Sequence, residues 1–245
     1  MDSFLLALQF LTIVPVKIKH FYEKKMAESL LYFPVIGLLL GLALAGCAGL
    51  LEWMNLEPLS IAIVLVILLA VFTGGMHLDG LADTADAILS RKPKDEMLRI
   101  MRDSHTGVMG TLSIIIIILL KIAFLYSLDR RMLAPALILM CVLSRWALVG
   151  LMFFFPYARQ DGKAKIFIQG INYRIVLICS LITLGIVIVA WPFGGMLVLL
   201  LAGLIAYSFA RFINLKIGGI TGDTLGAACE ITEAAVLFSI LFLRR

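Results

Sequence analysis

Apolar runs long enough to cross a lipid bilayer recur along the whole chain. They cover residues 30–52, 59–75, 109–128, 132–155, 175–191, 196–213 and 225–243. A helix needs roughly 17–25 apolar residues to cross the hydrocarbon core. Only 15% of the residues are charged, compared with about a quarter in an ordinary soluble domain. We therefore predict an all-α polytopic integral membrane protein of about seven transmembrane helices, folded as one membrane-embedded domain over residues 1–245.

Two shorter segments predict helices that do not span. Residues 4–16 are apolar, contain Pro15 and run into Lys17 and Lys19, so we expect a re-entrant or interfacial helix. The basic n-region of a signal peptide is missing before them. Residues 94–102 place Met97 and Met101 on one helical face with charges elsewhere, which predicts an amphipathic helix on the cytoplasmic membrane surface.

The basic residues predict the orientation in the membrane. Fifteen of the 21 Lys and Arg residues fall between spans on one side, and four fall on the other. Positive loops stay inside, so the richer side is predicted to face the cytoplasm across the inner membrane of a bacterium or archaeon. The basic residues are dispersed and lack interleaved aromatics, which argues against nucleic-acid binding.

A first glycine motif, residues 74–86, holds three carboxylates in eight residues on the predicted cytoplasmic side. On a helix, Asp79, Asp83 and Asp86 project at roughly 0°, 40° and 340°, so they share one face. Their repulsion is costly unless a cation lies between them. Hard oxygen ligands suit Mg²⁺, which in proteins commonly serves a phosphate-bearing substrate. His77 precedes them and is a candidate general base or hydrogen-bond donor to a phosphate, with a structural histidine as the alternative.

A second glycine motif, residues 218–226, opens the last span. Its aspartate, Asp223, follows the second glycine, Gly219, by four positions, as Asp79 follows Gly75. A degenerate internal repeat is one interpretation of this spacing. Glycines let a phosphate approach backbone N–H groups at a helix N-terminus, so Gly219 and Thr221 are predicted phosphate contacts.

Carboxylates also lie inside the last span, where they are expensive and suggest a function. Glu230 and Glu233 are three residues apart, and Asp223 lies two turns earlier on a similar face. We expect this set to complete a metal site or to orient a hydroxyl. The alternative is structural pairing with Arg145, which lies within the span of residues 132–155 and is also a candidate substrate contact.

Two loops supply further candidates for phosphate binding. Residues 101–110 contain Arg102, Ser104 and His105, and Asp103 is a candidate metal ligand; the alternative is an ordinary helix start with Asp103 or Ser104 as N-cap. Arg159 lies in the loop of residues 156–163. A topological role for that arginine is as plausible as phosphate binding.

Four motifs together resemble one family. The segments are GGMHLDGLADTADA, MRDSHTGVMG, PYARQDGKAKIF and GGITGDTLGAACEITE, in this order between spans. They are similar to cobalamin synthases, the adenosylcobinamide-GDP ribazoletransferases, and the resemblance covers essentially the whole chain. The family often has arginine where this chain has His105.

The resemblance implies Mg²⁺-dependent transfer from adenosylcobinamide-GDP to α-ribazole or its 5′-phosphate, giving adenosylcobalamin or its phosphate and GMP. We expect the 5′-hydroxyl of the ribazole to be the nucleophile. The predicted metal ligands are Asp79, Asp83, Asp86, Asp223, Glu230 and Glu233. The predicted catalytic residues are His77, Asp83, Asp223 and Glu230. The predicted phosphate contacts are Arg102, Ser104, His105, Arg145, Arg159, Gly219 and Thr221.

Two other functions compete with this one. A CDP-alcohol phosphotransferase also binds Mg²⁺ through clustered aspartates, but in that family's pattern an arginine follows, whereas here Asp79-Gly80 is followed by Leu81-Ala82-Asp83. An ion-coupled transporter would use Glu230 and Glu233 as midplane carboxylates.

Overall fold

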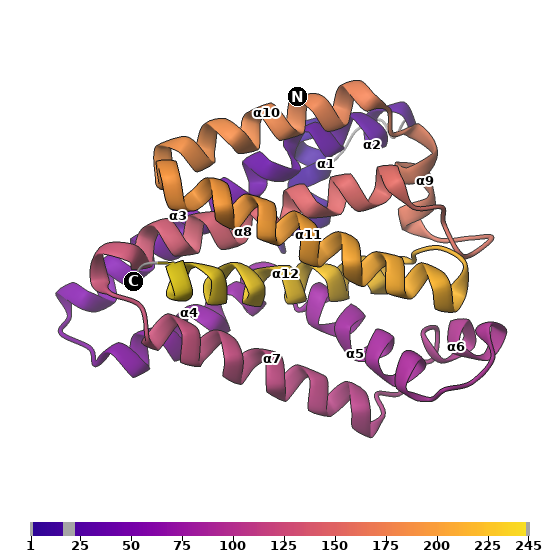
Figure 1. Cartoon of the computed structure of the whole chain (residues 1–245), viewed down its shortest axis with the longest axis horizontal. Coiled ribbons are helices and arrows are strands. Elements are labelled where there is room, and N and C mark those ends of the chain that lie inside the picture. Colours follow the sequence, from indigo (N-terminus) through magenta and orange to yellow (C-terminus); the bar gives the residue numbers. More distant parts are fainter. Residues whose placement is uncertain (1, 17–22, 244–245) are drawn as a thin grey trace.

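The computed structural model describes residues 2–16 and 23–243 and is helical almost throughout (Figure 1). The helices are α1 (Asp2–Leu11), α2 (Glu23–Ser29), a short 3₁₀ helix η1 (Leu30–Tyr32), α3 (Phe33–Trp53), α4 (Pro58–Phe72), α5 (Met76–Leu89), α6 (Lys94–Ile100), α7 (Val108–Tyr126), α8 (Arg130–Phe154), α9 (Lys163–Gly170), α10 (Tyr173–Ala190), α11 (Pro192–Ile217) and α12 (Gly222–Leu243). The described residues contain no β-strand, only an isolated bridge between Tyr157 and Ile220. The predicted all-α class is confirmed.

Six helices are long and apolar enough to cross a membrane: α7, α8, α10, α11, α12, and α3 together with the residues from Lys25 that precede it. The number rises to seven if α4 and α5, which are bent by 89° at their junction, are counted together as one span. The prediction of about seven spans is therefore confirmed, with one difference. The span expected at residues 59–75 ends at Phe72, and its 15 residues reach only about 22 Å as a helix.

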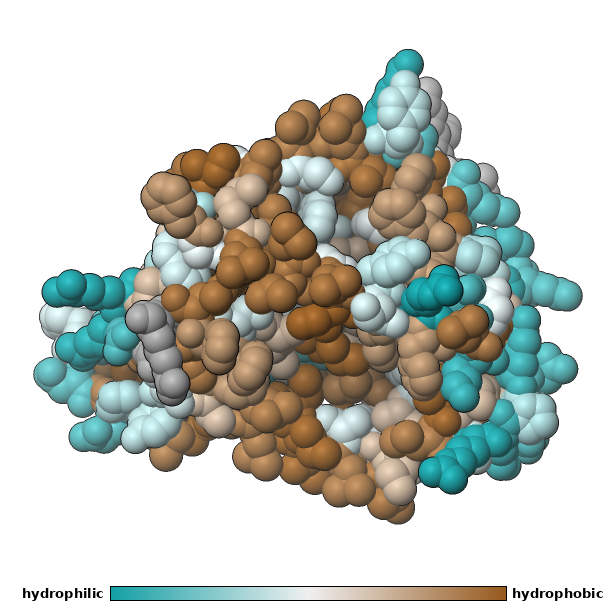
Figure 2. All heavy atoms as spheres, in the orientation of Figure 1, coloured by the Kyte–Doolittle hydropathy of each residue, from teal (hydrophilic) through white to brown (hydrophobic). Residues whose placement is uncertain are grey.

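The surface has the pattern of a membrane protein. An apolar band lies between two hydrophilic ends, and the end that carries α5, α6 and α9 is the more hydrophilic (Figures 1 and 2). Large apolar side chains such as Leu119 on α7 and Leu181 on α10 are more than half exposed. Lipid tails cover such side chains as well as a protein core does.

Helices α8 and α12 form the centre of the bundle. Both are largely buried, and α12 packs against α5, α7, α8 and α11 (Figure 1). Helix α8 also packs along α3. The central pair therefore runs from the apolar interior to the hydrophilic end, where the glycine motifs lie.

The two predicted short helices are present. Helix α1 covers ten residues, fewer than a span needs, while Lys17 and Lys19 lie outside the described residues. Helix α6 buries Met97 and Met101 against Ile213 and Ile217 of α11. Its apolar face therefore docks on the protein, which differs from the expected contact with lipid.

Candidate functional site

Both glycine motifs are turns at which one helix ends and the next begins. Gly75, the N-cap of α5, has φ = 69°, and Gly218, the C-cap of α11, has φ = 75°. Residues with a Cβ rarely adopt this left-handed conformation. The local structures differ, because α5 begins directly after Gly75 whereas two residues separate Gly219 from α12, but Asp79 and Asp223 each lie in the first turn of the following helix.

Helices α5 and α12 touch where these first turns meet. A Cβ on Gly80 would come within 2.6 Å of the carbonyl oxygen of Asp223. The close approach puts carboxylates from both motifs in one electrostatic group, because Asp83 interacts most strongly with the charges of Asp79 and Asp223 and more weakly with that of Asp86. We call Asp79, Asp83 and Asp223 the aspartate group.

The loop of residues 155–162 brings Arg159 to the aspartate group. The loop pairs with the second glycine motif through Ala158 N–H, which donates to Ile220 O at 2.9 Å, and Ile220 N–H, which donates to Pro156 O at 2.8 Å. Arg159 Nη2 then donates to Asp223 Oδ2 at 2.5 Å. The positive charge lies where three carboxylates would otherwise repel one another.

Gly219 has a packing role, which differs from the predicted phosphate contact. A Cβ there would lie 2.5 Å from Pro156 O, so only glycine allows the loop to approach so closely. Thr221 also differs from its predicted role. It is fully buried, and Thr224 N–H donates to its Oγ1 at 3.2 Å while its own N–H donates to Thr224 Oγ1 at 2.8 Å. These bonds satisfy N–H groups at the start of α12.

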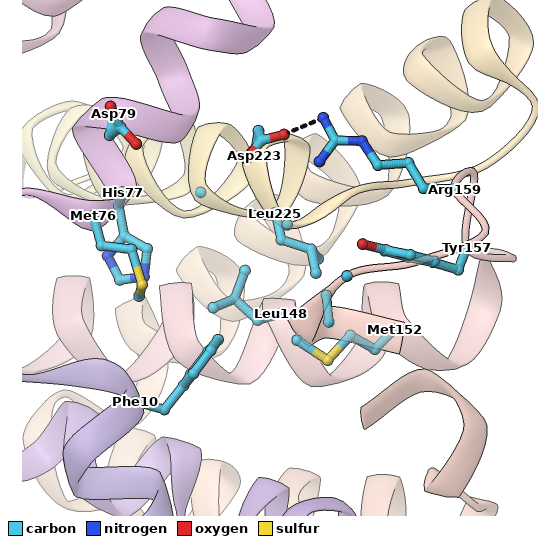
Figure 3. A pocket seen from close by; sticks show the side chains of 14 residues that line it. Phe10, Met76, His77, Asp79, Leu148, Met152, Tyr157, Arg159, Asp223 and Leu225 are labelled. Atoms are coloured by element: carbon cyan, nitrogen blue, oxygen red, sulfur yellow. Dashed lines mark hydrogen bonds and ion pairs between the residues drawn. The ribbon is translucent and has the colours of Figure 1, made fainter. Parts of the chain in front are cut away.

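A cavity of about 290 Å³ opens beside the aspartate group (Figure 3). Asp79, Asp223, Arg159 and His77 lie on its polar side, and apolar side chains from α1, α8 and α12 line the rest. Helix α5 begins at Met76, so His77 lies inside its first turn rather than before it.

Two buried polar atoms of the cavity lining have no protein partner. His77 is 3% exposed and its Nδ1 makes no hydrogen bond to any described residue; the same is true of Arg159 Nε. A buried polar group without a partner is costly. Both residues line the cavity, although neither of these two atoms is itself exposed to it.

Tyr157 lies on the rim of the cavity and was not predicted from the sequence as a site residue, although the motif of residues 156–163 contains it. Burial raises the pKa of its phenol, against the opposing effect of the nearby Arg159 guanidinium. The hydroxyl is therefore protonated at neutral pH, and it donates to Asp161 O at 3.5 Å.

Asp86 does not line the cavity, and its metal role stays a prediction. Its carboxylate accepts hydrogen bonds from Gly107 N at 2.6 Å and Gly110 N at 2.8 Å, at the start of α7. A Cβ on either glycine would clash with this carboxylate, at 2.5 Å or less. The charge satisfies orphan N–H groups and complements the helix dipole.

Glu230 and Glu233 lie deeper in the bundle and are paired with cations, as in the structural alternative to their predicted metal and catalytic roles. Lys121 of α7 donates to Glu230 Oε2 at 2.6 Å and also to Glu233, and Arg145 of α8 donates to Glu233. None of these four residues is more than 4% exposed. Two cations neutralise two carboxylates, so Arg145 has a structural partner instead of the predicted substrate contact. The sequence feature that indicates this cluster is Lys121, a single cation within the span of residues 109–128.

The loop between α6 and α7 lies outside the cavity lining. Arg102, Ser104 and His105 are exposed, and His105 pairs with Asp103 at 2.6 Å. This hydrogen bond lowers the pKa of Asp103, which is stabilised as an anion by its neighbour. Of the four, Arg102 interacts electrostatically with Tyr157 and so lies nearest the cavity rim.

The six predicted metal ligands thus occupy three places: the aspartate group, the start of α7 and the buried ion-pair cluster. Among the described residues, no three His, Cys, Asp or Glu side chains form a site for a metal ion by themselves. The aspartate group by itself is therefore an incomplete set of metal ligands. Such an arrangement suits an ion that a substrate also ligates.

A family model for cobalamin-5-phosphate synthase matches residues 3–241 of the chain. The chain belongs to this family. Family members named adenosylcobinamide-GDP ribazoletransferase include one from Roseiflexus sp., 38% identical over 96% of this chain and 87% of its own length. Others are from Desulforamulus reducens, 36% identical over 98% of this chain and 96% of its own, and from Klebsiella pneumoniae, 36% identical over 98% and 99%. No solved structure matches the chain.

Proposed function

We propose that the protein catalyses Mg²⁺-dependent transfer of the adenosylcobinamide phosphate group from adenosylcobinamide-GDP to α-ribazole or its 5′-phosphate. The products are adenosylcobalamin or its phosphate and GMP, as the names of the family and its members suggest. One observation carries the proposal beyond those names. Carboxylates from both glycine motifs meet Arg159 at a single cavity that also contains an unpaired histidine.

The transfer replaces one phosphorus–oxygen bond with another. A ribose hydroxyl attacks the phosphorus that bears the cobinamide arm, the bond from that phosphorus to the GMP oxygen breaks, and GMP leaves with the electron pair. The family description names a product phosphorylated at position 5. Since an acceptor that keeps its 5′-phosphate has no free 5′-hydroxyl, we propose a secondary ribose hydroxyl as the nucleophile in place of the expected 5′-hydroxyl.

His77 is the proposed acceptor of the hydroxyl proton. The residue lines the cavity, and its buried Nδ1 has no competing partner among the described residues. A general base must lie within hydrogen-bond reach of the proton it removes. Asp223 is less suited to this role because its carboxylate already accepts from Arg159.

Asp79 and Asp83 are the proposed Mg²⁺ ligands, with Asp223 and Arg159 beside them. Mg²⁺ generally keeps several waters and binds one or two carboxylates together with substrate phosphates. The aspartate group, which is an incomplete set of metal ligands by itself, fits binding of this kind. When bound, the ion neutralises charge on the diphosphate and on the departing GMP. Arg159 orients Asp223 and offers its unpaired Nε to a phosphate oxygen.

The cavity and the glycine motifs are proposed to face the cytoplasm across an inner membrane. They lie at the end of the bundle that carries α6 and α9, and this is the more hydrophilic end (Figure 2). Arg91, Arg99 and Arg102 lie at this end, as the positive-inside rule requires of a cytoplasmic face. Nucleotide-linked substrates would reach the site from that side.

The transporter alternative requires Glu230 and Glu233 to bind an ion. Both are paired with cations of the protein, so the structure does not favour this alternative. Product analysis tests the transferase proposal. Purified protein in liposomes is given adenosylcobinamide-GDP and α-ribazole, with Mg²⁺ or with excess chelator. We expect equal amounts of GMP and adenosylcobalamin, lost on chelation and in Asp83→Asn but retained in the exposed control Asp95→Asn. Absence of product from folded protein, or turnover of CDP-linked donors instead, would overturn the proposal.

A further inference from the structure

The cavity has two walls of opposite chemistry (Figure 3). One wall is the polar side described above. The other is apolar and consists of Phe10 from α1, Leu148 and Met152 from α8, and Leu225 from α12. We call these four side chains the apolar wall. A site for a diphosphate and a metal ion alone has no need of such a surface.

The apolar wall has a shape fixed by its surroundings. Leu148, Met152 and Leu225 are each no more than 4% exposed. Phe10 packs against two aromatic rings behind it, with its centroid 6.0 Å from that of Phe33 and 4.9 Å from that of Phe167. Close-packed side chains of this kind resist rearrangement, so the wall discriminates between ligands by size and polarity.

We infer that the apolar wall holds the heterocyclic base of the acceptor nucleoside, so that Leu148 and Met152 determine which bases are accepted. This inference rests on the proposed function. The benzimidazole base of α-ribazole is flat and apolar, and its ribose is then at the polar wall, where Asp223 and His77 lie.

The other parts of the substrates fit this wall poorly. Guanine carries several donors and acceptors that four apolar side chains leave unsatisfied, which is costly. The corrinoid macrocycle is too large for about 290 Å³, a volume at the lower limit of pockets for drug-sized ligands. Both groups therefore lie outside the cavity, with the diphosphate at its polar side.

The test compares two acceptors, the ribosides of dimethylbenzimidazole and of unsubstituted benzimidazole, in wild-type protein and variants. Leu148→Phe narrows the wall, and a pocket commonly discriminates tenfold or more per methyl-sized change. We expect the ratio of kcat/KM for the dimethylated over the unsubstituted acceptor to fall about tenfold, with the KM for adenosylcobinamide-GDP unchanged. Leu148→Ala widens the wall and is expected to raise the ratio.

Leu200→Phe is the matched control, because Leu200 is 68% exposed on α11 and distant from the cavity lining. Thermal inactivation of each variant in detergent reports folding. If Leu148→Phe does not fold, the ratio for Leu148→Ala decides the question. An unchanged ratio in a folded Leu148 variant, or a raised KM for the donor, would overturn the inference. Absence of GMP from wild-type protein with either acceptor would instead reject the proposed function.

Discussion

Gly80 lies directly against the backbone of Asp223, so that a Cβ on Gly80 would come within 2.6 Å of the Asp223 carbonyl oxygen. This contact joins the two glycine motifs, which are more than 130 residues apart in the sequence. It sets how closely the carboxylates of α5 approach that of α12, and with that the geometry of the proposed metal site.

Gly80→Ala is therefore expected to separate α5 from α12 and to lower GMP release at least tenfold, because misplacing reacting groups by about 1 Å commonly costs a hundredfold. The control is Gly46→Ala on α3, where a Cβ meets nothing within 4 Å. Membrane insertion of both variants is checked by detergent extraction and size-exclusion chromatography. Wild-type turnover in Gly80→Ala would show that the contact is unimportant for catalysis.

Asp86→Ala removes the acceptor for two N–H groups at the start of α7. We expect a stability loss of about 1 kcal/mol, measured as a lower midpoint of thermal unfolding in detergent, since losing a helix cap typically costs this much. Because Asp86 lies outside the aspartate group, activity below the transition should survive. A variant with unchanged stability but no turnover would return Asp86 to the metal site.

Lys121→Met leaves two buried carboxylates with only Arg145 to neutralise them. Breaking a buried ion pair in this way costs about 3–5 kcal/mol, so the folded yield should drop sharply. The double variant Lys121→Met, Glu230→Gln restores charge balance and should be less damaged than the single variant. A stable, well-expressed Lys121→Met would contradict a structural role for this cluster.

Arg159→Gln removes the cation that pairs with Asp223 at 2.5 Å. A charge-assisted hydrogen bond is worth about 1.5–3 kcal/mol, so kcat/KM for adenosylcobinamide-GDP should fall roughly tenfold to a hundredfold. Arg159→Lys keeps the charge without the planar geometry and should fall between the two. Gln160→Ala, at an exposed neighbour, serves as the control. Equal activity in Arg159→Gln and Gln160→Ala would remove Arg159 from the site.

Much of the fold follows from local properties of the chain. The length of each apolar run requires helices that cross a bilayer, because an unpaired backbone group in lipid is costly. The one misjudged span, α4, was read as continuous through residues 73–75, although Gly74 and Gly75 allow the left-handed turn that ends it. The amphipathic helix at residues 94–102 was predicted correctly, but its partner is α11 instead of lipid.

The site was only partly predictable, because contacts between segments far apart in the sequence decide which side chains meet there. Helical periodicity placed Asp79, Asp83 and Asp86 on one face, yet N–H groups at the start of α7 donate hydrogen bonds to Asp86. The carboxylates in α12 were recognised as unusual, but their neutralisation depends on Lys121, more than 100 residues away. Tyr157 and the apolar wall carry no local pattern that separates them from ordinary loop and core residues.

The sequence by itself determined that the chain is a helical membrane protein, which end carries the charged loops, and which two glycine motifs bear the carboxylates of the aspartate group. These properties follow from hydrophobicity, charge and backbone preference, which act along the chain. Only the tertiary structure decided which carboxylates share a cavity, since that depends on which helices touch. Asp223 joins Asp79 because α5 packs on α12 at Gly80, whereas Glu233 is neutralised because α12 also packs on α7 and α8.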